Sequence, residues 1–211
     1  IRSFFSTEGY VVFIPYARPS GLTHDAYTAV ARKKFNELNI ALKGVHEGDS
    51  PEEVVKGATG IFTGGGNTFV LLNELHKSGI METIRKQVLE GVPYMGTSAG
   101  SNIAGQTIQT TNDMPIVYPP TFDALGCIRS NLNPHYLDPV PGLKHMGETR
   151  ETRIKEFHTY NDIPVIGLRE GSWLHREGNT MLLKGEHPMR LFTAGNDPQE
   201  MESGSDLSFL I

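Results

Sequence analysis

The chain has 211 residues, of which 38% are hydrophobic and 20% charged, and its formal net charge is −5. This length favours one domain with a sizeable core, over residues 1–211. A mildly acidic chain without a basic block is not expected to bind nucleic acid, and no apolar run is long enough to span a membrane. The single cysteine, Cys127, excludes an internal disulfide and favours a reducing, cytoplasmic location.

Strands and helices alternate in the first half of the chain. Residues 10–15 predict a strand buried on both faces, and residues 27–38 place their apolar side chains on one helical face. Further strands are predicted at 40–42, 60–63 and 92–95, and further helices after Ser50-Pro51-Glu52-Glu53, at 69–75 and at 81–89. This alternation predicts a mainly parallel sheet covered by helices.

The second half has a looser pattern. Residues 107–120 are polar and contain prolines, which indicates a loop, whereas 148–157 have helical character and 164–168 form another buried strand. Shorter strands are predicted at 173–174, 181–183 and 189–192, antiparallel at an edge of the sheet. The pattern assigns no element to 207–211.

The pentapeptide Gly96-Thr97-Ser98-Ala99-Gly100 follows the predicted strand at 92–95. It has the G-x-S-x-G pattern of a nucleophile elbow, a sharp strand-to-helix turn that needs small residues on both sides of the serine. Such a turn would expose the Ser98 hydroxyl and leave the amide of Ala99 free to donate to an oxyanion. The alternative is an ordinary turn, since glycine and serine are common in loops.

A glycine-rich segment, Gly64-Gly65-Gly66-Asn67-Thr68, separates another predicted strand from its helix. It lacks the lysine of a phosphate-binding loop and the G-x-G-x-x-G spacing of a dinucleotide site. Because glycines let backbone amides approach a ligand closely, Gly66 is a candidate for the second oxyanion donor. The alternative is a plain turn in which Asn67 caps the next helix.

A catalytic serine needs a base, and the base needs an orienting carboxylate. His135 follows Pro134, and we expect it at the end of a strand, facing a loop-lined cleft. Glu170 lies just beyond the strand at 164–168, at the edge where parallel sheets form sites, and Asp113 lies in a loop that could cover the same edge. Either acid could instead be a turn or cap residue. No metal site is expected, because the chain has no H-E-x-x-H motif and no cysteine pair.

Several ordered motifs together resemble the peptidase E family of serine peptidases, the aspartyl dipeptidases. The similarity runs from residue 11 to about residue 195, although the family's first strand has no counterpart here and Thr97 stands where bacterial relatives often have a bulky aromatic residue. The motifs are Ser98-Ala99-Gly100, Asn133-Pro134-His135 and the segments 64–69, 110–117, 122–125, 147–151 and 170–173.

The resemblance implies an α/β fold of the class I glutamine amidotransferase type, a three-layer sandwich with a mainly parallel central sheet and helices on both faces. It implies a serine peptidase that hydrolyses dipeptides with an N-terminal aspartate and needs no metal or other cofactor. The expected partner is a small peptide substrate, with no nucleic acid and no membrane, and a homo-oligomer is compatible with the resemblance.

The resemblance also assigns site residues. Ser98 becomes the nucleophile, His135 the general base and Glu170 the orienting acid, with Asp113 as the competing acid. The amides of Gly66 and Ala99 match the oxyanion donors.

Two further residues are candidates for substrate binding. Arg150 matches the residue that holds the aspartate side chain of the substrate, and a guanidinium group suits a carboxylate because it can form two parallel hydrogen bonds. Its alternative is an ion pair with Glu148 or Glu151 on a solvated helix face. Asn67 is the second candidate, and its capping role competes with that function.

Two other functions stay open at this point. One is a cyanophycinase-like exopeptidase or an esterase of the same superfamily, and the other is a catalytically silent binding protein. A polymer-cleaving enzyme would hydrolyse dipeptides slowly, whereas a silent protein would leave Ser98 unreactive towards a serine-directed phosphonate.

Overall fold

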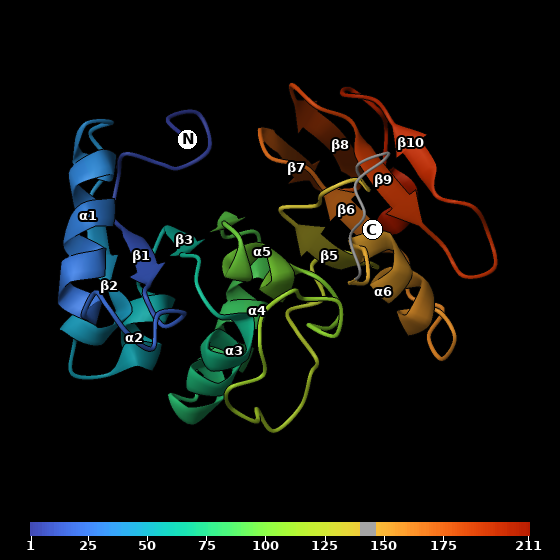
Figure 1. Ribbon diagram of the computed structural model, residues 1–211. Helices are drawn as coiled ribbons and strands as arrows, with labels where there is room; N and C mark the ends of the chain where they lie inside the picture. Colours follow the sequence, from blue (N-terminus) through green and yellow to red (C-terminus); the bar gives the residue numbers. More distant parts are fainter. Residues whose placement is uncertain (140–146) are drawn as a thin grey trace.

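The computed structural model describes residues 1–139 and 147–211 and combines sheets with surrounding helices (Figure 1). The first sheet has four parallel strands in the order β2-β1-β3-β4. Its strands are β1 (Val11–Ile14), β2 (Leu42–Gly44), β3 (Gly60–Thr63) and β4 (Tyr94–Gly96).

The second sheet has the order β10-β9-β6-β5. Strands β5 (Asn131–Pro134) and β6 (Val165–Leu168) are parallel, so their carboxyl ends meet at one edge. Strands β9 (Met189–Phe192) and β10 (Gln199–Met201) continue the sheet in antiparallel fashion. A separate hairpin is formed by β7 (Ser172–Glu177) and β8 (Thr180–Gly185).

Helices connect these strands, and side-chain caps fix their starts. Ser50 accepts a hydrogen bond from the Glu53 amide, with Pro51 in the first helical position, as the sequence predicts. The helices are α1 (His24–Asn36), α2 (Pro51–Lys56), α3 (Thr68–Lys77), α4 (Met81–Leu89), α5 (Ala99–Ala104) and α6 (Arg150–Phe157), with short 3₁₀ turns η1 (Val45–Glu47) and η2 (Ser208–Leu210).

Helices cover both faces of the first sheet because β1 directs alternate side chains to opposite sides. Val11 and Phe13 pack with Phe35 of α1, whereas Val12 and Ile14 belong to a core that includes residues of α2, α3, α4 and α5. The predicted α/β fold, mainly parallel and with helices on both faces, is confirmed.

Helix α5 joins the two sheets and therefore positions the candidate serine. It packs against β3 and β4 of the first sheet and against β5 of the second, and it lies between the sheets in Figure 1. None of the helices in the described ranges combines the length and apolar character that a membrane crossing needs.

Three local predictions differ from the structure. Strand β2 begins at Leu42 and not at Ile40, because the Ile40 amide is bonded to the Phe35 carbonyl at the end of α1. The predicted strands near 173 and 181 form their own hairpin, and of the three strands predicted at the edge only the one at 189–192 joins the sheet, as β9. Strand β10 escaped prediction because it is short and two of its three residues, Gln199 and Glu200, are polar, and the unassigned tail is anchored by the buried side chains of Leu207 and Leu210.

Candidate active site

Ser98 lies on a strained turn between β4 and α5. Its φ of 53° and ψ of −110° lie outside the regions that non-glycine residues ordinarily occupy. A Cβ atom on Gly96 would lie 2.2 Å from the Gly100 carbonyl oxygen, and one on Gly100 would lie 2.3 Å from the Thr63 carbonyl oxygen. The backbone packing therefore requires both glycines of the G-x-S-x-G pattern, and the turn has the form of a nucleophile elbow.

The glycine-rich segment lies directly beside Ser98. A Cβ atom on Gly65 would be 3.0 Å from the Ser98 Cβ atom, and the Gly65 amide donates to the Tyr27 hydroxyl over 3.0 Å. Gly66 has a φ of 146°, and a Cβ atom there would lie 2.2 Å from the Ala17 carbonyl oxygen. Within the described residues, no hydrogen bond uses the amide of Gly66 or of Ala99, so both donors are available to a ligand.

The structure brings His135 and Glu170 together. His135 follows β5 and Glu170 lies just beyond β6, so the parallel pairing of these strands places both at one edge. His135 has a φ of 55°, and its Nδ1 atom contacts the Glu170 Oε1 atom. The contact leaves the Nε2 atom of the imidazole for a second partner. Both side chains are accessible, with exposed fractions of 52% and 75%.

Asp113 is engaged elsewhere. Its carboxylate accepts hydrogen bonds from the Thr68 amide (2.7 Å), the Thr68 hydroxyl (2.6 Å) and the Thr111 hydroxyl (3.1 Å). These contacts fasten the loop of Asp113 to the start of α3, where a carboxylate is favourable. The structure therefore gives Asp113 a holding role, and the acid that contacts His135 is Glu170.

Asn67 caps α3 with its side-chain oxygen, which accepts a hydrogen bond of 3.0 Å from the Val70 amide. Its side-chain nitrogen donates to the Met114 carbonyl over 2.9 Å. Both polar ends of this side chain are thus used within the protein, and its predicted contact with substrate stays a prediction.

A network of buried hydrogen bonds connects the elements of the site, and the sequence analysis did not predict it. Asn102 of α5 is buried and donates to the hydroxyls of Thr68 (2.9 Å) and Thr111 (3.2 Å), while Asn133 of β5 donates to the Thr110 carbonyl over 2.7 Å. This network links α5, α3 and β5 through residues 110–113. Asn102 and Asn133 are both buried, and buried polar side chains of this kind need hydrogen-bond partners.

Arg150 is the first residue of α6, and Thr149 caps this helix by accepting a hydrogen bond from the Thr152 amide. The Nη1 atom of Arg150 is buried and has no hydrogen-bond partner among the residues that the structure describes. Burial, followed by repulsion from Arg153, lowers the pKa of the Arg150 guanidinium. A buried cationic donor without a partner is costly, which is expected of a group that binds an anionic ligand.

The predicted alternative for Arg150 was an ion pair with a neighbouring glutamate. Glu148 instead lies 3.7 Å from Arg153, and Glu151 pairs with Lys155 and Arg190, each over 2.7 Å. In the described ranges, the acidic neighbours of Arg150 are thus directed to other cations. Tyr136, the residue after His135, acts electrostatically in the direction opposite to burial and raises the pKa of Arg150.

Ser98 and His135 are not joined by a hydrogen bond in the described part of the chain. The two residues are linked through elements, since Ser98 precedes α5, α5 packs on β5, and His135 follows β5. Catalytic hydrogen bonds are often loose in unliganded proteins and tighten when substrate binds.

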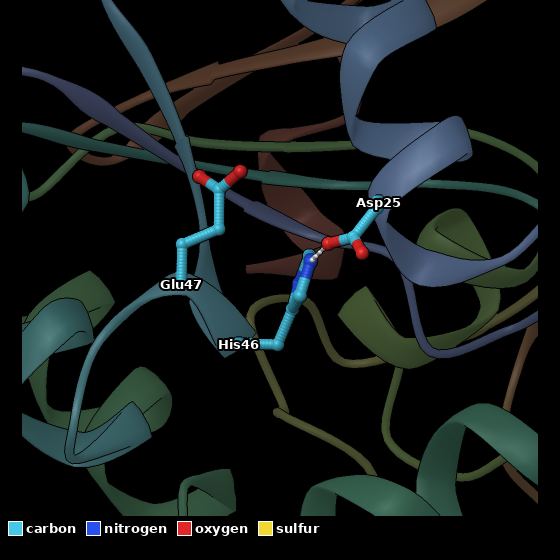
Figure 2. A group of neighbouring side chains, drawn as sticks. All are labelled: Asp25, His46 and Glu47. Carbon is cyan, nitrogen blue, oxygen red and sulfur yellow. Dashed lines mark hydrogen bonds and ion pairs between the residues drawn. The ribbon is translucent and has the colours of Figure 1, made fainter.

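One group elsewhere has the composition of a metal site. Donor atoms of Asp25, His46 and Glu47 all lie within 4.8 Å of one another (Figure 2). Glu47 is occupied by Arg32 and the Gly44 amide, however, and the His46 Nε2 atom is 2.8 Å from Asp25. An arginine on the carboxylate disfavours a cation there, and the contacts hold η1 against the start of α1.

Comparison with known proteins agrees with the resemblance found in the motifs. A family model described as "Peptidase family S51" matches residues 1–184. The chain is 48% identical to a Streptomyces coelicolor protein named "Peptidase E", over 100% of this chain and 86% of that protein. It is 44% identical to a Drosophila melanogaster protein named "Probable alpha-aspartyl dipeptidase", over 95% of this chain and 83% of that protein.

The fold is likewise similar to that of a solved peptidase. The crystal structure of a peptidase from an acI-B1 actinobacterium superposes with a TM-score of 0.68 at 19% identity, over 94% of this chain and 83% of that one. Such a likeness supports the fold, whereas the family model and the curated relatives carry the assignment. The chain belongs to peptidase family S51.

Proposed function

We propose that this protein is a serine-type dipeptidase that hydrolyses dipeptides with an N-terminal aspartate. Family membership supports a peptide substrate, and relatives bear the names peptidase E and alpha-aspartyl dipeptidase. The observation that carries the substrate class is the buried guanidinium nitrogen of Arg150, which has no hydrogen-bond partner within residues 1–139 and 147–211. The aspartate side chain of a substrate would supply the missing carboxylate.

The chemistry follows from the available atoms. The Ser98 hydroxyl attacks the peptide carbonyl, its proton passes to the Nε2 atom of His135, and Glu170 stabilises the imidazolium through Nδ1. The amides of Gly66 and Ala99 hold the oxyanion. When the C–N bond breaks, His135 returns the proton to the leaving amine, and the aspartyl group stays on Ser98 as an ester.

The second half of the reaction reverses these roles. Water attacks the ester carbonyl, His135 takes the water proton and returns it to the Ser98 oxygen, and aspartate leaves as a free amino acid. The side-chain carboxylate of the substrate aspartate stays paired with Arg150 throughout. The binding energy of this pair holds the scissile carbonyl beside Ser98. In this scheme the chain needs no metal or other cofactor.

The proposal also gives the protein a setting. A single cysteine and a net charge of −5 support a cytoplasmic enzyme that acts on small peptides and binds neither nucleic acid nor membrane. Asn67 stays in the proposal as a candidate contact for the substrate beside Gly66.

The substrate class is tested with the three dipeptides Asp-Leu, Glu-Leu and Ala-Leu. We expect kcat/KM for Asp-Leu to exceed the other two values by about 100-fold or more, because a fixed arginine fork reads both the charge and the length of the side chain. Release of leucine is measured by chromatography at several substrate concentrations. Equal values for the three dipeptides would contradict the proposed specificity.

The choice between the two acids is tested with Glu170→Gln and Asp113→Asn. The first change should lower kcat about 100-fold with little effect on stability, because it removes the charge that stabilises the imidazolium. The second should lower the free energy of unfolding by about 2 kcal/mol, because charged hydrogen bonds at the start of α3 are lost. Activities are compared at a temperature where circular dichroism shows both variants folded, and a larger loss of kcat in Asp113→Asn would overturn the assignment of Glu170.

A further inference from the structure

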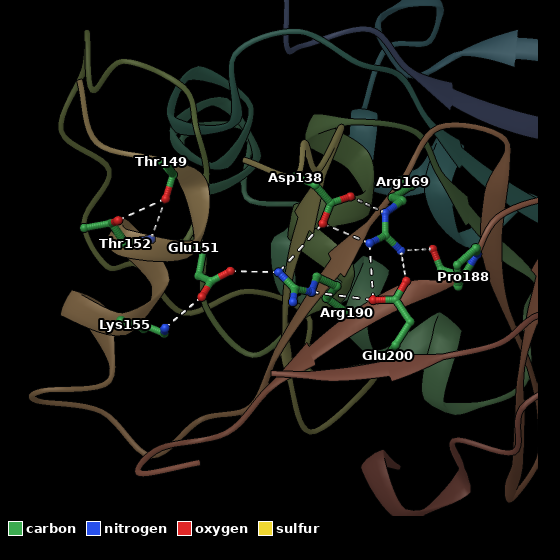
Figure 3. A network of polar contacts seen from close by, with 9 residues as sticks. All are labelled: Asp138, Thr149, Glu151, Thr152, Lys155, Arg169, Pro188, Arg190 and Glu200. Carbon is green, nitrogen blue, oxygen red and sulfur yellow. Dashed lines mark hydrogen bonds and ion pairs between the residues drawn. The ribbon is translucent and has the colours of Figure 1, made fainter. Parts of the chain in front are cut away.

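Five charged side chains from the second half of the chain contact one another. Arg169 forms two parallel hydrogen bonds with Asp138, of 2.8 and 3.0 Å, and also contacts Glu200 (Figure 3). Arg190 bonds to Glu151 over 2.7 Å and approaches Asp138 and Glu200 at 3.7 and 3.5 Å. These residues, here called the ion network, connect the end of β6, the segment after β5, β9, β10 and α6.

The Asp138–Arg169 pair, here called the first arm of the ion network, is close in sequence to the His135–Glu170 contact. Asp138 lies three residues after His135, and Arg169 immediately precedes Glu170. The two segments are therefore joined at two points by side chains, with a backbone hydrogen bond of 3.0 Å from Tyr136 to the Leu168 carbonyl between them.

The two side-chain contacts, His135–Glu170 and Asp138–Arg169, differ in exposure and geometry. The His135–Glu170 pair is exposed, and exposed ion pairs contribute little because they are screened and must order two side chains. The Arg169 side chain is only 18% exposed, and its fork geometry matches the Asp138 carboxylate in two places. Arg169 holds the pKa of the Asp138 carboxyl below its usual range, which favours the charged form of Asp138 in this ion pair. Asp138 is 45% exposed, so the Asp138–Arg169 pair is the less exposed of the two.

The Arg190–Glu151 pair, here called the second arm, is adjacent in sequence to Arg150. Glu151, the next residue of α6, is 20% exposed and is bonded to Arg190 of β9, which is 24% exposed. This link fastens the first turn of α6 to the second sheet. Since Arg150 makes no hydrogen bond with its Nη1 atom in the described ranges, its direction depends on how that first turn is held.

We infer that the ion network is a positioning device with two separable arms, in which Asp138–Arg169 aligns the His135–Glu170 pair and Arg190–Glu151 aims Arg150. The inference deepens the proposed function and rests on it for the roles of His135, Glu170 and Arg150. Asp138, Arg169, Arg190 and Glu151 are positioning residues, since they act through their neighbours and do not touch the reacting atoms.

The arms are tested with Asp138→Asn and Glu151→Gln, which keep side-chain size and remove charge. Asp138→Asn should lower kcat for Asp-Leu about tenfold with KM nearly unchanged, and Glu151→Gln should raise KM about tenfold with kcat nearly unchanged. In a Glu170→Gln background, Asp138→Asn should cause no further loss, because a residue that acts through Glu170 is silent once Glu170 is altered. If Asp138→Asn does not fold, Arg169→Lys replaces it with the same expectation, since lysine keeps the charge and loses the fork.

A second readout keeps this inference separate from the proposed substrate. The rate at which a serine-directed phosphonate labels Ser98 depends on the His135–Glu170 pair and not on a dipeptide, and Asp138→Asn should slow it about tenfold. Failure of the wild-type protein to hydrolyse Asp-Leu would count against the proposed function alone. Unchanged labelling in Asp138→Asn, or equal losses of kcat with and without Glu170, would overturn the inference. Glu37→Gln, which breaks an exposed pair with Lys34 on α1, is the matched control and should change neither rate.

Discussion

Replacement of Ser98 by alanine should abolish hydrolysis of Asp-Leu, with kcat falling by about 10⁵-fold or more because the nucleophile itself is lost. The remaining oxyanion donors and binding groups would leave only weak catalysis over the uncatalysed reaction. Release of leucine is measured over hours at high enzyme concentration, with phosphonate labelling as a second readout. Retained activity, or labelling of the alanine variant at the wild-type rate, would contradict the assignment of Ser98.

A glycine variant separates the chemistry of Ser98 from the fold of the elbow. In most loops alanine is more stabilising than glycine, because it restricts the unfolded chain. At Ser98 the order should be reversed by about 1–2 kcal/mol, since the φ of 53° and ψ of −110° are costly for any residue with a Cβ atom. Ser101, which lies inside α5 and has no positive φ, is the matched control, and there alanine should be more stable than glycine. Thermal unfolding of the four variants measures both differences.

The sequence predicts the scaffold of this site well because its signals are local. The Ser50 cap, the apolar run of β1 and the alternation of strand and helix determine elements within about ten residues, and each appears in the structure. The spacing of glycines around Ser98 also predicts the elbow, since only glycine fits where Gly96 and Gly100 meet other backbone atoms. These features need no knowledge of distant contacts.

The features that escaped prediction depend on distant contacts. The residues alone left Asp113 and Glu170 as alternatives, the resemblance favoured Glu170, and the contact of Glu170 with His135 depends on the pairing of β5 with β6. The three hydrogen bonds that occupy Asp113 come from Thr68 and Thr111, and Thr68 lies 45 residues away in the chain. A carboxylate does not reveal its partner from its own neighbourhood in the sequence.

The ion network illustrates the same limit. Asp138, Glu151, Arg169, Arg190 and Glu200 are spread over the second half of the chain, and each alone has the appearance of an ordinary surface charge. Their association follows from the order β10-β9-β6-β5 together with the position of α6. Arrangements of this kind become visible only when the sheet order is known.

Replacement of Arg150 by methionine should remove the preference for aspartate, with kcat/KM for Asp-Leu falling about 10³-fold while that for Ala-Leu is nearly unchanged. Arg150→Lys should lie between, because lysine keeps the charge but cannot form two parallel hydrogen bonds. Arg153→Met, three residues further along α6, removes an exposed arginine and is the matched control, which should retain the aspartate preference.

The same substitution should also stabilise the protein. A buried guanidinium nitrogen that has no hydrogen-bond partner in the described part of the chain is costly, and methionine fills the space without a polar group, so the free energy of unfolding should rise by about 1 kcal/mol. A residue kept for folding would show the opposite change, with lower stability and a similar loss on all three dipeptides. Thus an Arg150→Met variant that unfolds at a higher temperature and no longer distinguishes Asp-Leu from Ala-Leu would identify Arg150 as a group whose partner is the substrate. A less stable variant that still prefers Asp-Leu would exclude Arg150 from the site.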